Sequence, residues 1–204
     1  MTPDPHSLYT ERLAARRADI AHIETLKPDV IITHDQFGGY GHSDHIKLHQ
    51  ATLRAYELLY GIQLGTGDGH AVVTQAPPAR APTEQASSIP RLYVTAFSRQ
   101  LLRFAVRLLP ILGQNPRQFG RNKDIDLVQI SSWFVPITTR IPVKTYLPYK
   151  HRASACHVSQ IAPTQSGSLV TRLAFRRAEG IETFSRLYPP VVHSERIEID
   201  LFGK

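Results

Sequence analysis

The feature that most constrains the fold of this chain is a short β-branched segment between two helical patterns. Asp29–His34 contains the run Val-Ile-Ile-Thr and follows directly on a helix predicted over Leu8–Leu26. A short apolar, β-branched run of this kind is typical of a buried parallel strand. After a glycine-rich turn, a second helix is predicted from Ser43, as its N-cap, to about Leu59. This order of helix, strand, turn and helix predicts an α/β fold.

The remaining chain predicts further strands and helices around one long loop. Gly61–Pro90 is predicted to be loop, with a short strand at 71–74, because glycine and proline punctuate it. The β-rich segment Ile137–Val143 contains Pro142, which restricts it to a loop or an edge strand. A chain of 204 residues predicts a single domain over residues 1–204. The predicted strands are Leu92–Thr95, Ile125–Ile130, Ile137–Val143 and Ile197–Phe202, and the predicted helices are Phe97–Leu112, Tyr146–Gln160 and Ala174–Ser185.

The helix predicted over Phe97–Leu112 carries a basic stripe, formed by Arg99, Arg103 and Arg107. We interpret it as a surface helix that packs on the core through Leu101, Phe104, Leu108 and Leu112. The alternative is an interfacial helix in weak contact with anionic lipid or with a phosphorylated substrate. The net charge of +7 favours anionic partners in general. No basic block is interleaved with aromatic residues, so we expect no nucleic-acid partner.

Composition excludes several classes of protein. The single cysteine, Cys156, excludes a disulfide framework and a zinc site built from several thiolates. The N-terminal residues do not form a signal peptide pattern. No segment approaches the roughly 18 consecutive apolar residues that a membrane-spanning helix needs. We therefore expect a cytoplasmic protein.

The segment from His34 to His49 is the part of the sequence best suited to chemistry. It starts at the carboxyl end of the predicted parallel strand, where ligands bind in open α/β sheets. His42, His45 and His49 have a spacing that brings them to one face of a helix. Imidazole is a common metal ligand and a proton carrier near neutral pH, and Asp44 is near enough in sequence to orient His42. We expect His42, Asp44 and His45 to form a site and His49 to be structural.

These residues carry a resemblance to a known family. Residues 38–45, Gly-Gly-Tyr-Gly-His-Ser-Asp-His, resemble a motif of the PIG-L/LmbE-like zinc deacetylases that reads Gly-Gly-Tyr-Gly-His-Pro-Asp-His. Those enzymes remove N-acetyl groups from N-acetylglucosamine conjugates and related amides. The resemblance implies a Rossmann-like three-layer sandwich with a mostly parallel sheet. It implies a small amino-sugar conjugate as the binding partner. Weaker similarities lie at Lys27–Asp35, Ile137–Arg140, His157–Gln160 and from Glu182 to Phe202.

The resemblance also implies roles for four residues. His45 would be a zinc ligand. His42 would be the imidazolium that stabilises the tetrahedral oxyanion and helps to protonate the leaving amine. Asp44 would orient His42, and Tyr40 would polarise the acetamide carbonyl or donate a hydrogen bond to the oxyanion.

One departure from the family limits what this chain is expected to do alone. Members of the family begin with a strand that ends in Ala-His-Pro-Asp-Asp-Glu, which supplies two zinc ligands and a general base. This chain contains no His-Pro-Asp-Asp. We therefore expect the leading strands to be missing and the zinc ligand set to be incomplete. The isolated chain should then be poorly stable, bind zinc weakly and have little activity.

Two alternatives stay open. A reorganised site would use His34, Asp35 and His45 as ligands in place of the missing residues. The chain would otherwise be a non-catalytic remnant that binds sugar conjugates. Cys156 is interpreted as a small buried hydrophobic residue, and His157 as a residue that lines the substrate cleft.

Overall fold

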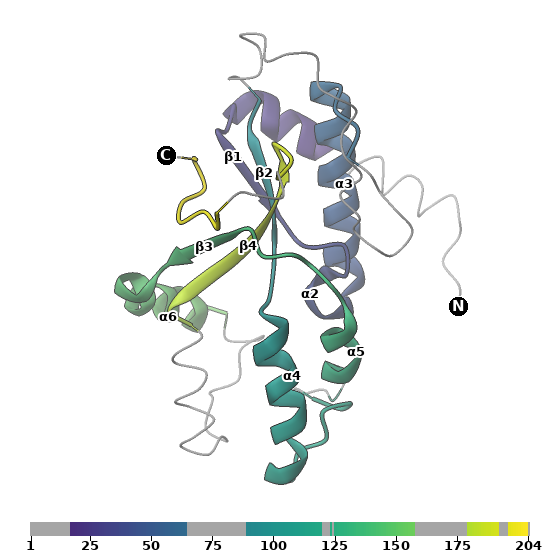
Figure 1. The fold of residues 1–204 in the computed structure, drawn as a ribbon. Coiled ribbons are helices and arrows are strands. Elements are labelled where there is room, and N and C mark those ends of the chain that lie inside the picture. Colours follow the sequence, from purple (N-terminus) through teal and green to yellow (C-terminus); the bar gives the residue numbers. More distant parts are fainter. Residues whose placement is uncertain are drawn as a thin grey trace, which may run out of the picture.

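The structure is a computed structural model that describes residues 17–64, 89–119, 123, 125–157, 179–191 and 196–203. A four-stranded sheet lies at its centre, α3 runs alongside the sheet, and α4 and α5 extend from one end of it (Figure 1). Residues 17–26 are helical. The further helices are α2 (Gly38–Gly41), α3 (Ser43–Tyr60), α4 (Arg99–Leu108), α5 (Leu127–Ser132) and α6 (Leu147–Ala155), with short 3-10 turns η2 (Pro110–Leu112) and η3 (Lys144–Tyr146).

The sheet is mixed. Its strands are β1 (Val30–Thr33), β2 (Arg91–Thr95), β3 (Thr139–Pro142) and β4 (Ile181–Tyr188), in the order β1-β2-β4-β3. β1 and β2 are parallel, whereas β4 is antiparallel to both β2 and β3. The predicted α/β class is confirmed, but the mostly parallel sheet is wrong for the described strands. A parallel pair needs a crossover, which α3 provides between β1 and β2, whereas β4 runs back along β2.

Several predicted elements are confirmed. The β-branched run after the first helix forms β1, and the predicted strand at Leu92–Thr95 forms β2. The second helix extends from Ser43 to Tyr60 and ends at Gly61, which adopts a left-handed conformation. The proline-containing β-rich segment forms β3, an edge strand of this sheet that ends at Pro142.

The predicted strand at Ile125–Ile130 is wrong, because Leu127–Ser132 forms the helix α5. The Asp126 carboxylate caps this helix by accepting a hydrogen bond from the Gln129 main-chain N–H, at 3.0 Å. An Asp followed three residues later by Gln is a helix start signal, and here it outweighs the β-branched residues.

The predicted secondary structure of the C-terminal region is also wrong. The described part of the predicted helix Ala174–Ser185 consists of a turn at 179–180 and the beginning of β4. The predicted strand Ile197–Phe202 is instead an irregular segment with one isolated bridge, between Glu198 and Thr139. β4 forms by pairing with β2 and β3, and contacts of Glu198, described below, hold the C-terminal segment.

Other predictions fall partly outside the described residues. These residues are 8–16 of the first helix, 65–88 of the predicted loop with its short strand, and 158–160 of the helix that forms α6. Among the helices that the structure describes, none is both long and apolar enough to cross a bilayer.

The core lies between α3 and the parallel pair of strands. Leu53 and Tyr56 of α3 pack against Leu92 of β2 in the main cluster of buried residues. The Tyr56 hydroxyl donates a 2.6 Å hydrogen bond to the Pro90 carbonyl, so the ring is buried without losing its polar partner. Burial raises the pKa of Tyr56. This packing holds α3, and the residues at its N-terminus, against the carboxyl end of β1.

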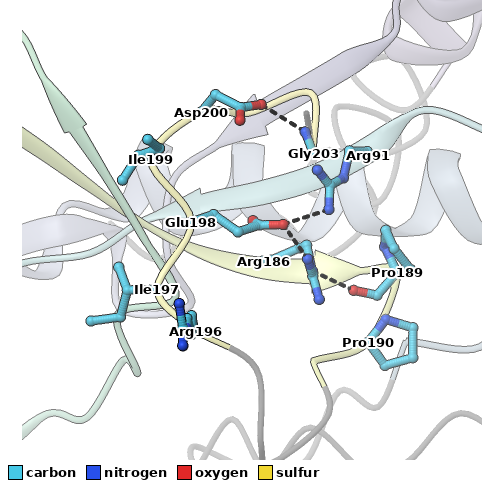
Figure 2. Close-up of a pocket in the computed structure, with 10 residues that line it drawn as sticks. All are labelled: Arg91, Arg186, Pro189, Pro190, Arg196, Ile197, Glu198, Ile199, Asp200 and Gly203. Carbon is cyan, nitrogen blue, oxygen red and sulfur yellow. Dashed lines mark hydrogen bonds and ion pairs between the residues drawn. The ribbon is translucent and has the colours of Figure 1, made fainter.

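A half-buried carboxylate, that of Glu198, attaches the C-terminal segment to the sheet (Figure 2). Glu198 accepts hydrogen bonds from Arg91 at 2.7 Å, from the Thr139 hydroxyl at 3.0 Å and from the Tyr93 hydroxyl at 3.1 Å. It also accepts one from Arg186 of β4. We call these five residues the Glu198 cluster. Since the donors come from β2, β3 and β4, one carboxylate connects three strands.

The charge of Glu198 is stabilised in the fold. Burial alone would raise its pKa above the ordinary 4.5, but the Arg91 hydrogen bond, the Arg186 charge and the two hydroxyls outweigh burial and lower the pKa. A depressed folded-state pKa contributes stability above the unfolded value, and this contribution is lost as the pH falls through the folded value.

We expect Glu198→Gln to lower the free energy of unfolding by about 2 kcal/mol near neutral pH, because hydrogen bonds to a charged acceptor are lost. The difference from wild type should shrink as the pH falls from the ordinary pKa of 4.5 through the lowered folded-state pKa, where the wild-type carboxyl becomes protonated in the fold. Urea unfolding over this pH range measures both effects. Glu182→Gln is the matched control, because Glu182 makes an exposed ion pair with Lys150 and should contribute little. A difference that does not depend on pH would contradict this account.

Candidate functional site

The turn after β1 is built around the buried carboxylate of Asp35, which is 3% exposed. One of its oxygens accepts hydrogen bonds from the main-chain N–H groups of Phe37, at 2.8 Å, and Gly39, at 3.0 Å. Gly38 and Gly39 both have positive φ, which suits glycine. The predicted glycine loop is therefore a short distorted helical turn, α2, with Gly39 and Tyr40 outside helical geometry.

Gly38 also approaches α3 closely. A Cβ atom at this position would lie 2.9 Å from Cγ1 of Ile46 and 3.0 Å from Cβ of His45. The absence of a side chain thus lets the turn pack directly on the first turn of α3, with the Gly38 carbonyl facing His45.

The N-cap of α3 is His42, which corrects the predicted cap at Ser43. Nδ1 of His42 accepts a hydrogen bond from the Asp44 main-chain N–H, at 3.2 Å. The Asp44 carboxylate is exposed and contacts the Ser43 hydroxyl at 3.4 Å and Lys47 at 3.7 Å. In this structure, therefore, the main chain of Asp44 holds His42, and its carboxylate interacts elsewhere.

Three imidazole rings meet at the carboxyl end of β1. The His34 and His45 rings are stacked, with centroids 3.9 Å apart and planes 3° apart. The His42 ring lies 4.6 Å from that of His45. The Tyr40 ring makes edge-to-face contacts with both rings, and its centroid lies 5.5 Å from that of His45 and 5.7 Å from that of His42. The structure thus brings His42, His45 and Tyr40 together and adds His34. We call the three histidines the imidazole cluster.

The hydrogen-bond partners assign the ring tautomers. Nδ1 of His45 lies 3.1 Å from the Gly38 carbonyl, which only accepts, so Nδ1 carries the proton and Nε2 is left as an acceptor. Nδ1 of His42 accepts from an N–H, so its proton is on Nε2. The two rings therefore present opposite groups, an acceptor on His45 and a donor on His42.

The two other histidines in this region are largely neutral. Burial, and after it the adjacent His45 imidazole, lower the pKa of His34 below 6.5, while the Asp35 carboxylate acts in the opposite direction. His49 is buried and donates from Nδ1 to the His34 carbonyl at 2.7 Å, and burial lowers its pKa as well. His49 therefore has the structural role expected of it, because it holds the end of β1 against α3.

The donors present do not complete a zinc site. Within the described part of the chain, no group of three or more His, Cys, Asp or Glu side chains is arranged to hold a metal ion. The alternative set of His34, Asp35 and His45 is not arranged as such a group among the described residues either, although the turn uses only one oxygen of the Asp35 carboxylate. A catalytic zinc centre takes three protein ligands. Of the cluster, His45 has the geometry of a single ligand, because its Nδ1–H is held by a carbonyl and its Nε2 is an acceptor.

Aromatic side chains from other elements surround the turn. Trp133, directly after α5, stacks on Phe37 with centroids 4.8 Å apart and planes 7° apart. A Cβ atom at Gly41 would lie 3.4 Å from this indole, and one at Gly39 would lie 3.7 Å from the Phe97 ring. No pattern in the sequence predicted that Trp133 and Phe97 lie beside the turn. Trp133 is the single tryptophan of the chain, which makes it conspicuous in the sequence. It lies about ninety residues after the glycine turn, however, and no local pattern connects residues so far apart.

Two cavities of the structure lie away from the imidazole cluster. One cavity, of about 590 Å³, lies at the Glu198 cluster (Figure 2), and a second lies between Ile23, Tyr60 and Tyr188. The imidazole cluster lines neither of them.

The prediction for Cys156 is wrong, and the prediction that His157 lines the substrate cleft stays a prediction. Cys156 is exposed, so its interpretation as a buried residue is wrong. It follows the last turn of α6, where its thiol donates to the Arg152 carbonyl at 3.4 Å. His157 is exposed beside it, and α6 is well separated from α2 in Figure 1.

We expect Gly38→Ala to destabilise the fold by about 3 kcal/mol, since it combines a left-handed backbone with a clash against α3. Gly61→Ala is the matched control. Its φ of 65° is close to the 63° of Gly38, but no atom lies within 4 Å of its Cβ position. The free energy of unfolding of Gly61→Ala should fall by only about 1 kcal/mol, because only the backbone strain is added. Urea unfolding of both variants measures the difference, and equal losses would contradict the close approach of the turn to α3.

Comparison with known proteins relates the chain to named deacetylases. It is 29% identical over 163 residues to the 1D-myo-inositol 2-acetamido-2-deoxy-alpha-D-glucopyranoside deacetylase of Thermobispora bispora, covering 80% of this chain and 47% of the relative. The protein of the same name from Rhodococcus erythropolis is 30% identical over 166 residues, covering 81% and 49%. The one from Kribbella flavida is 28% identical over 206 residues, covering 98% and 61%.

The chain spans about half the length of the curated relatives that it matches. No family model matches it, and no solved structure matches it. The similarity that residues 38–45 predict is nevertheless confirmed by these relatives: this chain is a sequence relative of the PIG-L/LmbE-like deacetylases.

Proposed function

We propose that this chain carries part of the active site of a hydrolase that removes the N-acetyl group from N-acetylglucosamine conjugates. The observation that carries the proposal is the meeting of His42, His45 and Tyr40 at the carboxyl end of β1. The names of the relatives support an inositol-linked amino sugar as the substrate. In this proposal the described sheet belongs to a Rossmann-like three-layer sandwich.

In the proposed reaction, His42 acts as the proton donor. Attack of water on an acetamide creates a tetrahedral oxyanion and requires a proton for the departing amine. Nε2–H of His42 is a donor in the observed tautomer and can interact with the oxyanion. To protonate the departing amine, His42 acts as the imidazolium: a proton on Nδ1 takes the place of the hydrogen bond from the Asp44 main-chain N–H, and transfer of the Nε2 proton to the amine returns the ring to its neutral form.

Tyr40 and Asp44 support His42 in this proposal. The Tyr40 ring is in edge contact with His42 and is partly exposed, so its hydroxyl can reach the acetamide carbonyl of a bound substrate. Removing one oxyanion donor of this kind typically costs about 100- to 1,000-fold in rate. Asp44 is a positioning residue, because its N–H holds Nδ1 of His42.

We further propose that the enzyme depends on zinc and that His45 is one ligand. The donors present do not complete the centre, so the remaining ligands would come from outside the described residues, and we derive no step through the metal. The free edge of β1 supports an added strand there. No described strand pairs with that edge, and Ile32 in it is 47% exposed.

The isolated chain should have little deacetylase activity and bind zinc weakly. Co-expression with a segment of a longer relative that contains His-Pro-Asp-Asp should restore both. Metal analysis and release of acetate from the inositol-linked N-acetylglucosamine conjugate measure these effects. Tight stoichiometric zinc in the isolated chain would contradict the incomplete ligand set.

In the complemented assembly, His42→Ala should lower the rate at least about 100-fold and leave zinc content nearly unchanged. His45→Ala should remove the zinc. His22→Ala is the control, because His22 is an exposed histidine on the first helix. If both site variants keep full activity, the assigned roles are wrong.

A second candidate function is a non-catalytic domain that binds sugar conjugates. It is favoured by the lack of a three-donor metal group among the described residues. Calorimetry with the same conjugate separates the two functions. Binding without acetate release, with added zinc and with the complementing segment present, would support the binding domain.

A further inference from the structure

The solvent-facing side of α4 and η2 has an unusual composition. Phe104 is 59% exposed and Ile111 is 81% exposed. Arg103 and Arg107 are exposed and lie one turn apart in α4, next to Phe104, whereas Ile111 belongs to η2, which follows α4 directly. We call these four residues the α4 face. It combines cations with large apolar side chains where a surface helix normally carries polar residues.

This arrangement differs from the one predicted. Phe104 and Leu112 were expected to pack on the core, but both are exposed. The inward side of the helix instead contains Leu102, Ala105 and Val106, which are half-buried, and the buried Leu109. The core of this region is therefore complete without Phe104 and Ile111. The predicted stripe members Arg99 and Leu101 lie outside the described side chains.

The positive charge of the chain is concentrated in the same region. From Phe97 to Lys123 the sequence contains six lysines and arginines and no acidic residue, in a chain whose net charge is +7. Among these, Arg117 makes an ion pair with Asp126 at 3.3 Å. The α4 face itself has no acidic residue that would neutralise it. It is thus complementary to a densely anionic surface.

The α4 face adjoins the candidate site. α5 packs against both α2 and α4, and the Phe97 ring, just before α4, lies beside Gly39 of the turn. In Figure 1, α4 extends from the end of the sheet where β2 finishes, with α5 alongside it. A surface that contacts α4 would therefore lie near the imidazole cluster, and not at the far end of the sheet.

We propose that the α4 face docks on an anionic lipid bilayer. The arginines would pair with lipid phosphates, and Phe104 and Ile111 would enter the boundary between headgroups and acyl chains. Two features favour lipid over nucleic acid or protein. The exposed apolar residues are on a projecting helix and not in a groove, and they form no series of stacked aromatics of the kind that binds single strands.

Co-sedimentation of the full chain with vesicles tests this proposal. The chain should bind phosphatidylcholine–phosphatidylserine vesicles at low salt and bind pure phosphatidylcholine vesicles far less, and the binding should fall as salt is added. Arg103→Gln with Arg107→Gln should weaken the partition by about tenfold or more. Phe104→Ser with Ile111→Ser should weaken it as well, because the apolar contribution is lost.

Matched controls lie on other surfaces. Arg54→Gln removes an exposed arginine of α3, and Ile199→Ser removes an apolar side chain that is also highly exposed. Both should bind vesicles like wild type. Failure to bind anionic vesicles, equal binding to neutral ones, or equal losses in controls and α4 variants would overturn the proposal. Self-association that the Phe104 and Ile111 variant abolishes, without vesicle binding, would instead identify a second copy as the partner.

Discussion

The buried carboxylate of Asp35 is the constraint on which the candidate site depends. Its two hydrogen bonds from main-chain N–H groups close the turn between β1 and α3 within a few residues. That closure brings the Gly38 carbonyl to His45 and stacks His34 on the same ring. These hydrogen bonds use one oxygen of the Asp35 carboxylate. Asp35 therefore shapes the turn that positions the histidines.

The two ends of the parallel strand pair have different roles. At the carboxyl end, imidazoles and aromatic rings surround a glycine turn. At the other end, Glu198 gathers donors from three strands and attaches the C-terminal segment. The first end resembles a site because its donors and acceptors are partly unused, whereas the second has its main carboxylate saturated with partners. If the site were chosen by the presence of a cavity alone, it would be placed at the Glu198 end.

The candidate site and the α4 face are connected through α5. Trp133, at the end of α5, packs on the turn, and α5 itself packs on α4. On the proposed function and the proposed docking, this connection would orient the histidines with respect to the surface that the α4 face contacts. The positive charge of the segment from Phe97 to Lys123 would then orient the protein on an anionic surface as well as attract it there.

Local sequence determined the elements whose signals are short-range. The β-branched run predicted β1, the histidine spacing predicted neighbouring rings at the start of α3, and Pro142 predicted an edge strand. Only the tertiary structure decided the others. Arg186 can be buried in β4 because Glu198, twelve residues further on, neutralises it, and no local pattern encodes that pairing. Phe104 faces solvent because Leu102 and Val106 already fill the inward side of α4. Periodicity identifies an amphipathic helix, but which apolar side chains are buried depends on the surfaces that meet it.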